Sequence, residues 1–136
     1  MTGSASDGDL RGVLGDWYAI RALVALEWLP AILVSLMNGP KHYSELLEDA
    51  NALHLAAVWD NRHGQLHEST LTRALKHLTE DGLIERQENH EAFITRVRYT
   101  LTPSAERLLD AVVPLTNWAR QHDKLIEEAR RRRQLT

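Results

Sequence analysis

Apolar residues recur at helical spacing over the first third of the chain. From Asp16, a residue type that often caps a helix, apolar side chains recur every three or four positions as far as Trp28. A second, strongly apolar helix is predicted to begin near Pro30, because proline in the first turn of a helix loses no hydrogen bond, and to end at the turn formed by residues 38–40. Residues 1–9 have no such period, and we expect them to form a flexible tail.

Two more helices are predicted before the chain changes character. Ser44 is positioned to cap the third helix, whose end is left open: the helical pattern can continue to Trp59, whereas turn-forming residues follow at 60, 61 and 64. Gly82 is suited to end the fourth helix. That helix has the clearest pattern, with one apolar face formed by Leu71, Ala74, Leu75 and Leu78.

Alternation of apolar and polar residues then predicts two strands. Residues 83–86 and 96–102 alternate, and the mostly polar segment between them is expected to join them as a hairpin. From Ser104 to about Arg133 the pattern is helical again, and Pro114 is expected to kink or divide this last helix.

This order of elements is that of a winged helix-turn-helix. We predict a mainly α fold with a small β-hairpin, in which residues 10–136 form a single domain with its core at 28–102. The helices predicted at 10–27 and 103–133 carry more apolar side chains than so small a domain can cover, so we expect a homodimer interface there, packing within one chain being the alternative. The expected dimer contacts are Leu14, Trp17, Leu115 and Trp118.

The polar side of the fourth helix carries the candidate chemistry. A helix that buries its leucine face presents its opposite side to solvent, and a helix is narrow enough for the major groove of DNA. Hydroxyl, guanidinium, ammonium and imidazole groups donate hydrogen bonds to phosphates or base edges. The predicted DNA-binding residues of this helix are Ser69, Thr70, Thr72, Arg73, Lys76 and His77. From the hairpin, Arg96, Arg98 or His90 is expected to reach an adjacent backbone or minor groove.

Several short segments are informative by their order and spacing: Trp28, Ile32, Leu33, Leu36, Gly39-Pro40, Tyr43-Ser44-Glu45-Leu46, Leu71-Thr72, Asp81-Gly82-Leu83-Ile84-Glu85-Arg86 and Arg96-Val97-Arg98-Tyr99-Thr100-Leu101-Thr102. Together they resemble the HxlR-type branch of the winged-helix transcription regulators, a family related in fold to MarR-type regulators. The resemblance covers roughly residues 28–118. It implies a dimeric DNA-binding regulator, held together by its terminal helices, that recognises a roughly palindromic operator.

The sequence departs from that family pattern in two main respects. The Cys-Pro pair that some members use to sense oxidants is missing, because the chain has no cysteine. Between Leu46 and Leu66 lie 19 residues, more than the family pattern carries, so we expect the third helix or the turn after it to be enlarged.

Charge gives the DNA interpretation no support by itself. The 136 residues carry 16 Lys and Arg against 19 Asp and Glu, a formal net charge of −3. Segment 62–98, which contains the predicted DNA-binding helix and hairpin, has six basic and six acidic residues. Any DNA site must therefore be a local arrangement of side chains.

The absence of cysteine excludes disulfides, thiolate zinc sites, cysteine nucleophiles and thiol redox sensing. The longest apolar stretch, residues 22–36, is interrupted by Glu27 and Pro30 and is too short to span a bilayer. The first residues do not resemble a secretory signal. We therefore expect a cytoplasmic protein that does not contact a membrane.

The enlarged segment admits two further interpretations. His54, His63 and His67 lie near one another, but their spacing matches no metal motif, so we predict no metal and no cofactor. The second interpretation is an apolar pocket that binds a small-molecule effector. The simpler alternative is that the aromatic residues of this region pack in the core. The residues expected to line that pocket are Trp17, Tyr18, Leu55 and Trp59.

The sequence contains none of the motifs typical of enzymes, such as a nucleophilic serine between glycines, a glycine-rich phosphate-binding loop or a pair of catalytic carboxylates. We therefore predict no catalytic residue. We predict a homodimeric transcription regulator, a repressor, that binds double-stranded DNA at a near-palindromic operator. The alternative is a winged-helix protein-interaction module in which the enlarged segment 47–65 covers the fourth helix and binds a protein instead of DNA.

Overall fold

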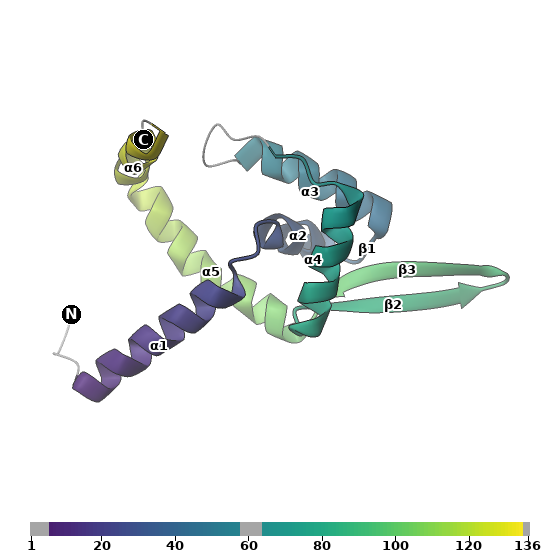
Figure 1. Cartoon of the computed structure of the whole chain (residues 1–136), viewed down its shortest axis with the longest axis horizontal. Coiled ribbons are helices and arrows are strands. Elements are labelled where there is room, and N and C mark those ends of the chain that lie inside the picture. Colours follow the sequence, from purple (N-terminus) through teal and green to yellow (C-terminus); the bar gives the residue numbers. More distant parts are fainter. Residues whose placement is uncertain (1–5, 58–63, 135–136) are drawn as a thin grey trace.

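The computed structural model describes residues 6–57 and 64–134, which form helices around a small antiparallel sheet (Figure 1). The helices are α1 (Asp7–Leu23), α2 (Leu29–Ser35), the 3-10 helix η1 (Leu36–Asn38), α3 (Tyr43–Ala57), α4 (Glu68–Glu80), α5 (Pro103–Gln121) and α6 (Asp123–Gln134). The strands are β1 (Lys41–His42), β2 (Ile84–Glu91) and β3 (Ile94–Leu101). This confirms the predicted winged helix-turn-helix: α3 and α4 form the helix pair, and β2 and β3 form the wing.

The hydrophobic core lies between α2, α3, α4 and the base of the wing. Helix α4 contributes all four residues of its predicted apolar face, each of them buried. Ile32 of α2 and Leu46 of α3 are completely buried in the same cluster, and Ile84 continues it into β2. Burying a side chain of this size stabilises a fold by about 1.5–3 kcal/mol, so the leucine face holds α4 in one orientation.

The wing is longer than the two short strands predicted from alternation. Strands β2 and β3 pair antiparallel from Ile84 opposite Leu101 to Glu91 opposite Ile94. The polar segment 87–95 therefore extends both strands and keeps only residues 92 and 93 for the turn. Polar residues suit this position because the outer part of the hairpin is exposed on both faces.

Strand β1 is a third strand that the sequence analysis did not anticipate. It pairs antiparallel with β3, with Lys41 opposite Tyr99 and His42 opposite Arg98. Two residues are too few to form a periodic pattern, so only the position of β3 in space identifies this segment as a strand.

Helix α1 begins well before Asp16, the predicted cap. The hydroxyl oxygen of Ser6 accepts a hydrogen bond from the Asp9 N–H at 3.2 Å, and acidic residues in the first turn favour the positive end of the helix dipole. Residues 7–9, predicted to belong to the tail, are therefore helical, and residues 1–5 of that tail lie outside the described residues.

Helix α3 also begins earlier than predicted, at Tyr43, so Ser44 is not its cap. The side chain of Glu45 accepts a hydrogen bond from the backbone N–H of His42 at 3.1 Å, which satisfies a donor at the helix start. The helix continues to Ala57 and so takes up part of the extra length in this segment.

The last helical region divides at His122 rather than at Pro114. Helix α5 continues through Pro114. A proline inside a helix removes one backbone hydrogen bond, but the turns on either side of it keep theirs and hold the helix together. At His122 the backbone leaves the helical conformation, with φ −120° and ψ 35°, and α6 starts directly afterwards at Asp123.

Two helical arms extend away from the core (Figure 1). Helix α1 has no buried residue, and α5 leads away from its buried Ala105 into α6, which has none either. Among the predicted dimer contacts, Trp17 is 58% exposed and Trp118 46% exposed, and Leu14 and Leu115 are exposed as well. None of the described helices is long and apolar enough to cross a membrane.

Candidate nucleic-acid interface

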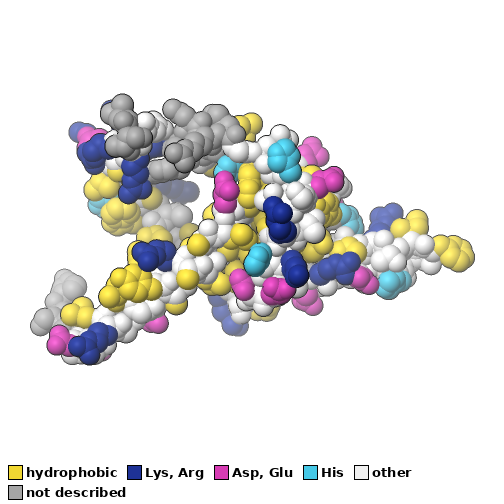
Figure 2. Space-filling model, in the orientation of Figure 1, with side chains coloured by type: hydrophobic (Ala, Val, Ile, Leu, Met, Phe, Trp, Pro, Cys, Tyr) yellow, Lys and Arg dark blue, Asp and Glu magenta, His cyan; other side chains and the backbone are white. Residues whose placement is uncertain are grey.

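Helix α4 presents the side opposite its leucine face to solvent. Ser69, Arg73, Lys76 and Glu80 recur at helical spacing and form one exposed ridge, which we call the outer ridge. Three of the six predicted DNA-binding residues of α4 lie on it. Figure 2 shows basic side chains over α4 and at the base of the hairpin, with acidic side chains among them.

The other three predicted residues of α4 flank the outer ridge. Thr72 lies on the side toward the wing, where its hydroxyl donates to the Glu68 carbonyl at 2.9 Å. Thr70, which is half-buried, and His77, which is exposed, lie on the opposite flank. The hydroxyl of Thr72 is thus already bonded within the protein, whereas Ser69, Arg73 and Lys76 have their polar groups exposed.

Tyr43, at the start of α3, fixes the first turn of α4. Its hydroxyl donates to the Glu68 carbonyl at 2.6 Å and lies 3.0 Å from the hydroxyl of Thr72. A phenol can act as donor and acceptor at once, so one side chain ties the two helices of the helix-turn-helix together.

Asn51 holds the chain at the entry to α4. Its side-chain amide donates to the carbonyls of Leu47 and Leu66 at 3.0 Å each, and its carbonyl oxygen accepts from the Leu66 N–H at 2.7 Å. Both backbone groups of Leu66 are therefore bonded to one side chain of α3. The chain is therefore attached to α3 at Leu66, two residues before α4 begins at Glu68.

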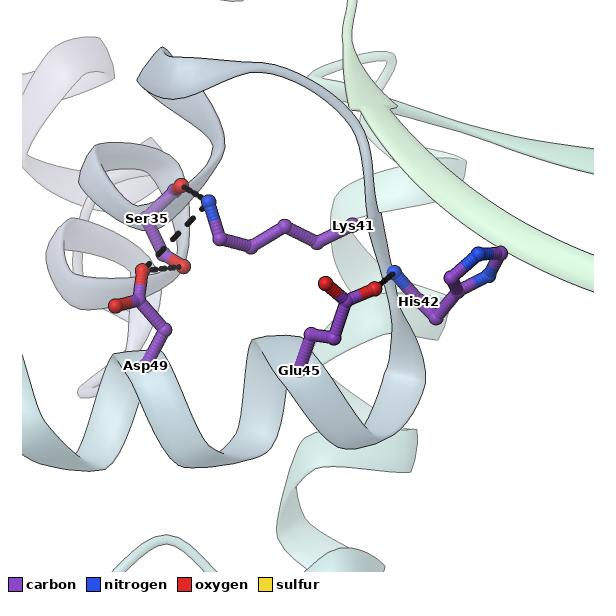
Figure 3. A network of polar contacts seen from close by, with 5 residues as sticks. All are labelled: Ser35, Lys41, His42, Glu45 and Asp49. Carbon is purple, nitrogen blue, oxygen red and sulfur yellow. Dashed lines mark hydrogen bonds and ion pairs between the residues drawn. The ribbon is translucent and has the colours of Figure 1, made fainter.

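A polar network fixes α3 relative to α2 and β1 (Figure 3). The Lys41 ammonium donates to the carbonyl of Ser35 at 2.6 Å and lies 3.7 Å from the Asp49 carboxylate. The hydroxyl of Ser35, itself buried, donates to the same carboxylate at 2.5 Å. Because β1 pairs with β3, this network also sets the position of the wing relative to α3.

The two faces of the wing carry different residues. Ile84 and Leu101 point into the core, so the alternation of side chains places Arg86, Tyr99 and His90 on the face that continues from the core. Arg96 and Arg98, the two predicted wing residues, lie on the opposite face, opposite Asn89 and Gln87. The hairpin keeps both arginines exposed but away from the face that adjoins α4.

Arg86 is a candidate residue that the sequence analysis did not select. It lines a hollow between α4 and the wing together with Lys76, Thr72 and Tyr99. Its guanidinium is also paired with the Glu88 carboxylate. Side chains alternate between the two faces of a strand, so the buried Ile84 indicates that residue 86 lies on the core side as well. This signal can be used only if the strand is known to continue to residue 86.

Glu88 connects the charged groups on this face of the wing. The hydrogen bond from Arg86 holds the pKa of the Glu88 carboxyl below its usual value, and His90, whose Nε2 lies 3.4 Å from the carboxylate, acts in the same direction. His90 Nδ1 also lies 3.1 Å from the Thr95 hydroxyl across the hairpin. These pairs neutralise part of the basic charge of the wing.

The described members of the predicted effector pocket lie on two different helices. Trp17 and Tyr18 are exposed on α1, and Leu55 is exposed on α3, which lies on the other side of the core (Figure 1). Trp59 lies outside the described residues. An apolar hollow occurs instead between α2 and α3, lined by residues that include Val34 and His54.

Of the three histidines considered for a metal, the two that the structure describes have separate surroundings. The ring of His54 stacks against Trp28 with centroids 4.2 Å apart, and His67 immediately precedes α4. His63 lies outside the described residues.

Comparison with known proteins assigns the chain to a family. The family model for the HxlR-like helix-turn-helix matches residues 23–127. The chain therefore belongs to the HxlR-like helix-turn-helix family, whose members are transcription regulators that bind DNA. A search of curated proteins found no significant match.

Solved structures agree with this assignment. The diamide-treated form of YodB from B. subtilis is 26% identical, with a TM-score of 0.59 over 77% of this chain and 90% of that one. The reduced form of the same transcriptional regulator superposes with a TM-score of 0.61 at 26% identity, over 77% of this chain and 89% of that one. A MarR-family structure from Enterococcus faecalis V583, 24% identical, has the same fold, with a TM-score of 0.64 over 96% of this chain and 99% of that one.

Proposed function

We propose that this helix-turn-helix regulator is a homodimeric repressor that binds a near-palindromic operator. The outer ridge of α4 enters the major groove, where Arg73 and Lys76 contact base edges or phosphates and Ser69 supports them. The observation that carries the proposal is the exposure of Arg73 and Lys76 on the outer ridge, which the buried leucine face on the opposite side of α4 holds in place.

The dimer is supported by the apolar side chains of the two arms. On α1, Leu10, Val13, Trp17 and Ile20 recur with spacings of three and four and are all exposed, which is the pattern of a helix seam that packs on another helix. Exposed Leu115 and Trp118 on α5 extend the apolar surface of the arms. Two copies joined there would present two α4 helices, and half-sites one turn apart require these to be about 34 Å from each other.

The wing has a supporting role in this proposal. Arg96 and Arg98 contact the backbone from one face of the hairpin, and Arg86 adds a third guanidinium on the face that adjoins α4. Thr70, Thr72 and His77 border the major-groove contact, with Thr72 acting mainly by holding the first turn of α4 through Tyr43.

Control by thiol oxidation has no place in the proposal, because the chain has no cysteine. The predicted effector pocket has none either, because Trp17 belongs to α1 and Leu55 to α3, and these two helices lie on different sides of the core (Figure 1). Repression then follows from occupation of the operator by the dimer.

The proposal is tested by selecting bound duplexes from a random DNA pool with the full chain. We expect enrichment of an inverted repeat whose two halves are one helical turn apart, and an affinity that falls steeply with salt because phosphate contacts release counterions. A reporter placed behind the selected site is expected to be silenced. If no duplex is enriched, the proposal is wrong and the protein-interaction module becomes the better interpretation.

A further inference from the structure

The tip of the wing is apolar, unlike the rest of the outer hairpin. Phe93 is fully exposed, at 105% of its reference area, and the neighbouring Ile94 is 59% exposed. In Figure 2 the hydrophobic colour covers the far end of the hairpin. A large aromatic side chain in water is unfavourable, and here it contributes no packing to the fold.

The local backbone does not explain why this residue pair stands at the tip. Ala92 occupies the first of the two turn positions with φ 55°, a left-handed conformation in which glycine or asparagine is the usual residue. The turn therefore keeps a residue with a Cβ in an unfavourable conformation and then presents a phenylalanine to solvent. Neither choice benefits the hairpin itself, which points to a contact made with something else.

The length of the wing is sufficient for the tip to reach DNA. Residues 84 to 91 make seven steps of about 3.3 Å, so the tip stands about 23 Å from the base of the hairpin. Half a turn of duplex, the separation between a major groove and the adjacent minor groove, is about 17 Å. With α4 in a major groove, the tip can therefore reach the neighbouring minor groove.

The composition of the tip suits a minor groove better than a phosphate backbone. Between residues 89 and 96 the charged side chains are one Glu and one Arg, at positions 91 and 96, and the protruding group is an aromatic ring. Proteins that bind the minor groove often insert an apolar side chain between base pairs, which partly unstacks them and bends the duplex.

We propose that Phe93 is an apolar wedge that enters the minor groove beside the groove occupied by α4 and opens a flexible base step there. The inference rests on the proposed function and adds a determinant of sequence preference. Pyrimidine–purine steps are the easiest to unstack, so the wedge selects TA or CA/TG about five base pairs outside the bases read by α4. The partner is double-stranded DNA, and the contact is with bases and sugars.

The test compares the wild type with Phe93→Ser and Phe93→Leu on duplexes selected by the wild-type protein. Affinity is measured at several salt concentrations, and bending is measured by energy transfer between dyes at the two duplex ends. Phe93→Ser is expected to bind about tenfold more weakly and to leave the duplex nearly straight, with an unchanged salt slope because no phosphate contact is lost. Phe93→Leu, which keeps an apolar group, is expected to retain both bending and affinity.

Two controls separate this inference from the proposed function. Arg96→Ala removes a charge from the same hairpin, and it is expected to lower the salt slope by about one without straightening the duplex. A selection repeated with Phe93→Ser is expected to keep the inverted repeat but to lose the preference at the flanking step. Equal thermal unfolding of the wild type and the three variants shows that the substitutions act on binding.

Three results would overturn the wedge. If Phe93→Ser binds and bends DNA like the wild type, the tip does not enter the groove, although the proposed function stands. If the variant binds more weakly but the bend and the flanking preference persist, Phe93 makes an ordinary surface contact. If the wild type enriches no duplex, the proposed function and the wedge both fail, and a protein becomes the partner of the tip.

Discussion

At the residue scale, the direct readout of bases that we propose depends most on Arg73. It lies near the middle of the outer ridge, and its guanidinium makes a long hydrogen bond of 3.5 Å to the Thr70 hydroxyl within the same helix. A guanidinium so placed can bind a guanine edge with two hydrogen bonds or neutralise a phosphate.

Arg73→Ala is therefore expected to weaken operator binding about tenfold at fixed salt. The matched control is Lys124→Ala, which removes one positive charge from exposed α6, away from α4 (Figure 1). Fluorescence anisotropy with a labelled duplex measures both. Unchanged affinity in Arg73→Ala would show that another face of α4 meets the DNA.

Asn51 determines where α4 begins. Asn51→Ala removes three hydrogen bonds and leaves the partly buried backbone groups of Leu66 without their partner. A loss of about 1–3 kcal/mol in the free energy of unfolding is expected, because an unsatisfied buried polar group costs its full desolvation. Chemical denaturation measures it.

The control for this substitution is Asn117→Ala, at an exposed position of α5, which is expected to change stability by less than about 0.5 kcal/mol. A variant at Asn51 that unfolds like the wild type would mean that the leucine face alone positions α4.

Single residues were predictable where one physical rule decided them. The leucine positions of α4 follow from helical periodicity, and all of them are buried as expected. Thr72, Tyr43 and Asn51 acquire their roles from partners in another element, and no local pattern records which partner a hydroxyl or an amide will meet.

At the scale of elements, the junction between α4 and β2 depends on a glycine. Gly82 has φ 79°, and a Cβ added there would meet no atom within 4 Å, so backbone conformation alone requires glycine. The Leu83 N–H then bonds back to the Leu78 carbonyl at 2.9 Å, which closes the helix and starts the strand.

Gly82→Ala is expected to lower the free energy of unfolding by about 1–2 kcal/mol, the cost of a left-handed alanine. Gly15→Ala is the matched control. Gly15 lies in α1, has no positive φ, and would have nothing within 4 Å of an added Cβ, so alanine there is expected to raise the free energy of unfolding by up to about 1 kcal/mol. Opposite signs in thermal unfolding support this explanation. Destabilisation by both substitutions would contradict it.

Element boundaries were harder to predict than element types. Residues 87–91 and 94–95 have no apolar alternation, yet they pair along the wing because each strand offers the other its backbone groups. Pro114 is a strong local signal for a break, but α5 tolerates it and ends at His122 instead. In both cases a cooperative ladder of hydrogen bonds outweighed the preference of single residues.

At the scale of the whole molecule, the two arms explain why so many large apolar residues are exposed. Trp17 on α1 and Trp118 on α5 both lie on helices that leave the core, and the Trp118 ring stacks on His122 with centroids 4.5 Å apart. A chain that remained a monomer would leave these surfaces in water.

Trp17→Ala is expected to weaken dimerisation by at least about tenfold, because buried tryptophans dominate most protein interfaces. Sedimentation equilibrium over a range of concentrations measures the dissociation constant. Met37→Ala is the control, since Met37 is also exposed, at 57%, but lies on η1 rather than on an arm. A wild type that stays monomeric at high concentration would contradict the dimer and, with it, the palindromic operator.

The sequence by itself determined the class of fold and the family. The order of helices and hairpin is set by local periodicity, and the buried face of α4 follows from the spacing of its leucines. Only the tertiary structure decided which polar groups are bonded within the fold and which are left exposed. Tyr43, Asn51 and Lys41 make contacts across distant segments, and the face of the wing that each arginine occupies depends on the register of β2 and β3. Such pairings arise from packing in three dimensions, and a linear pattern does not contain them.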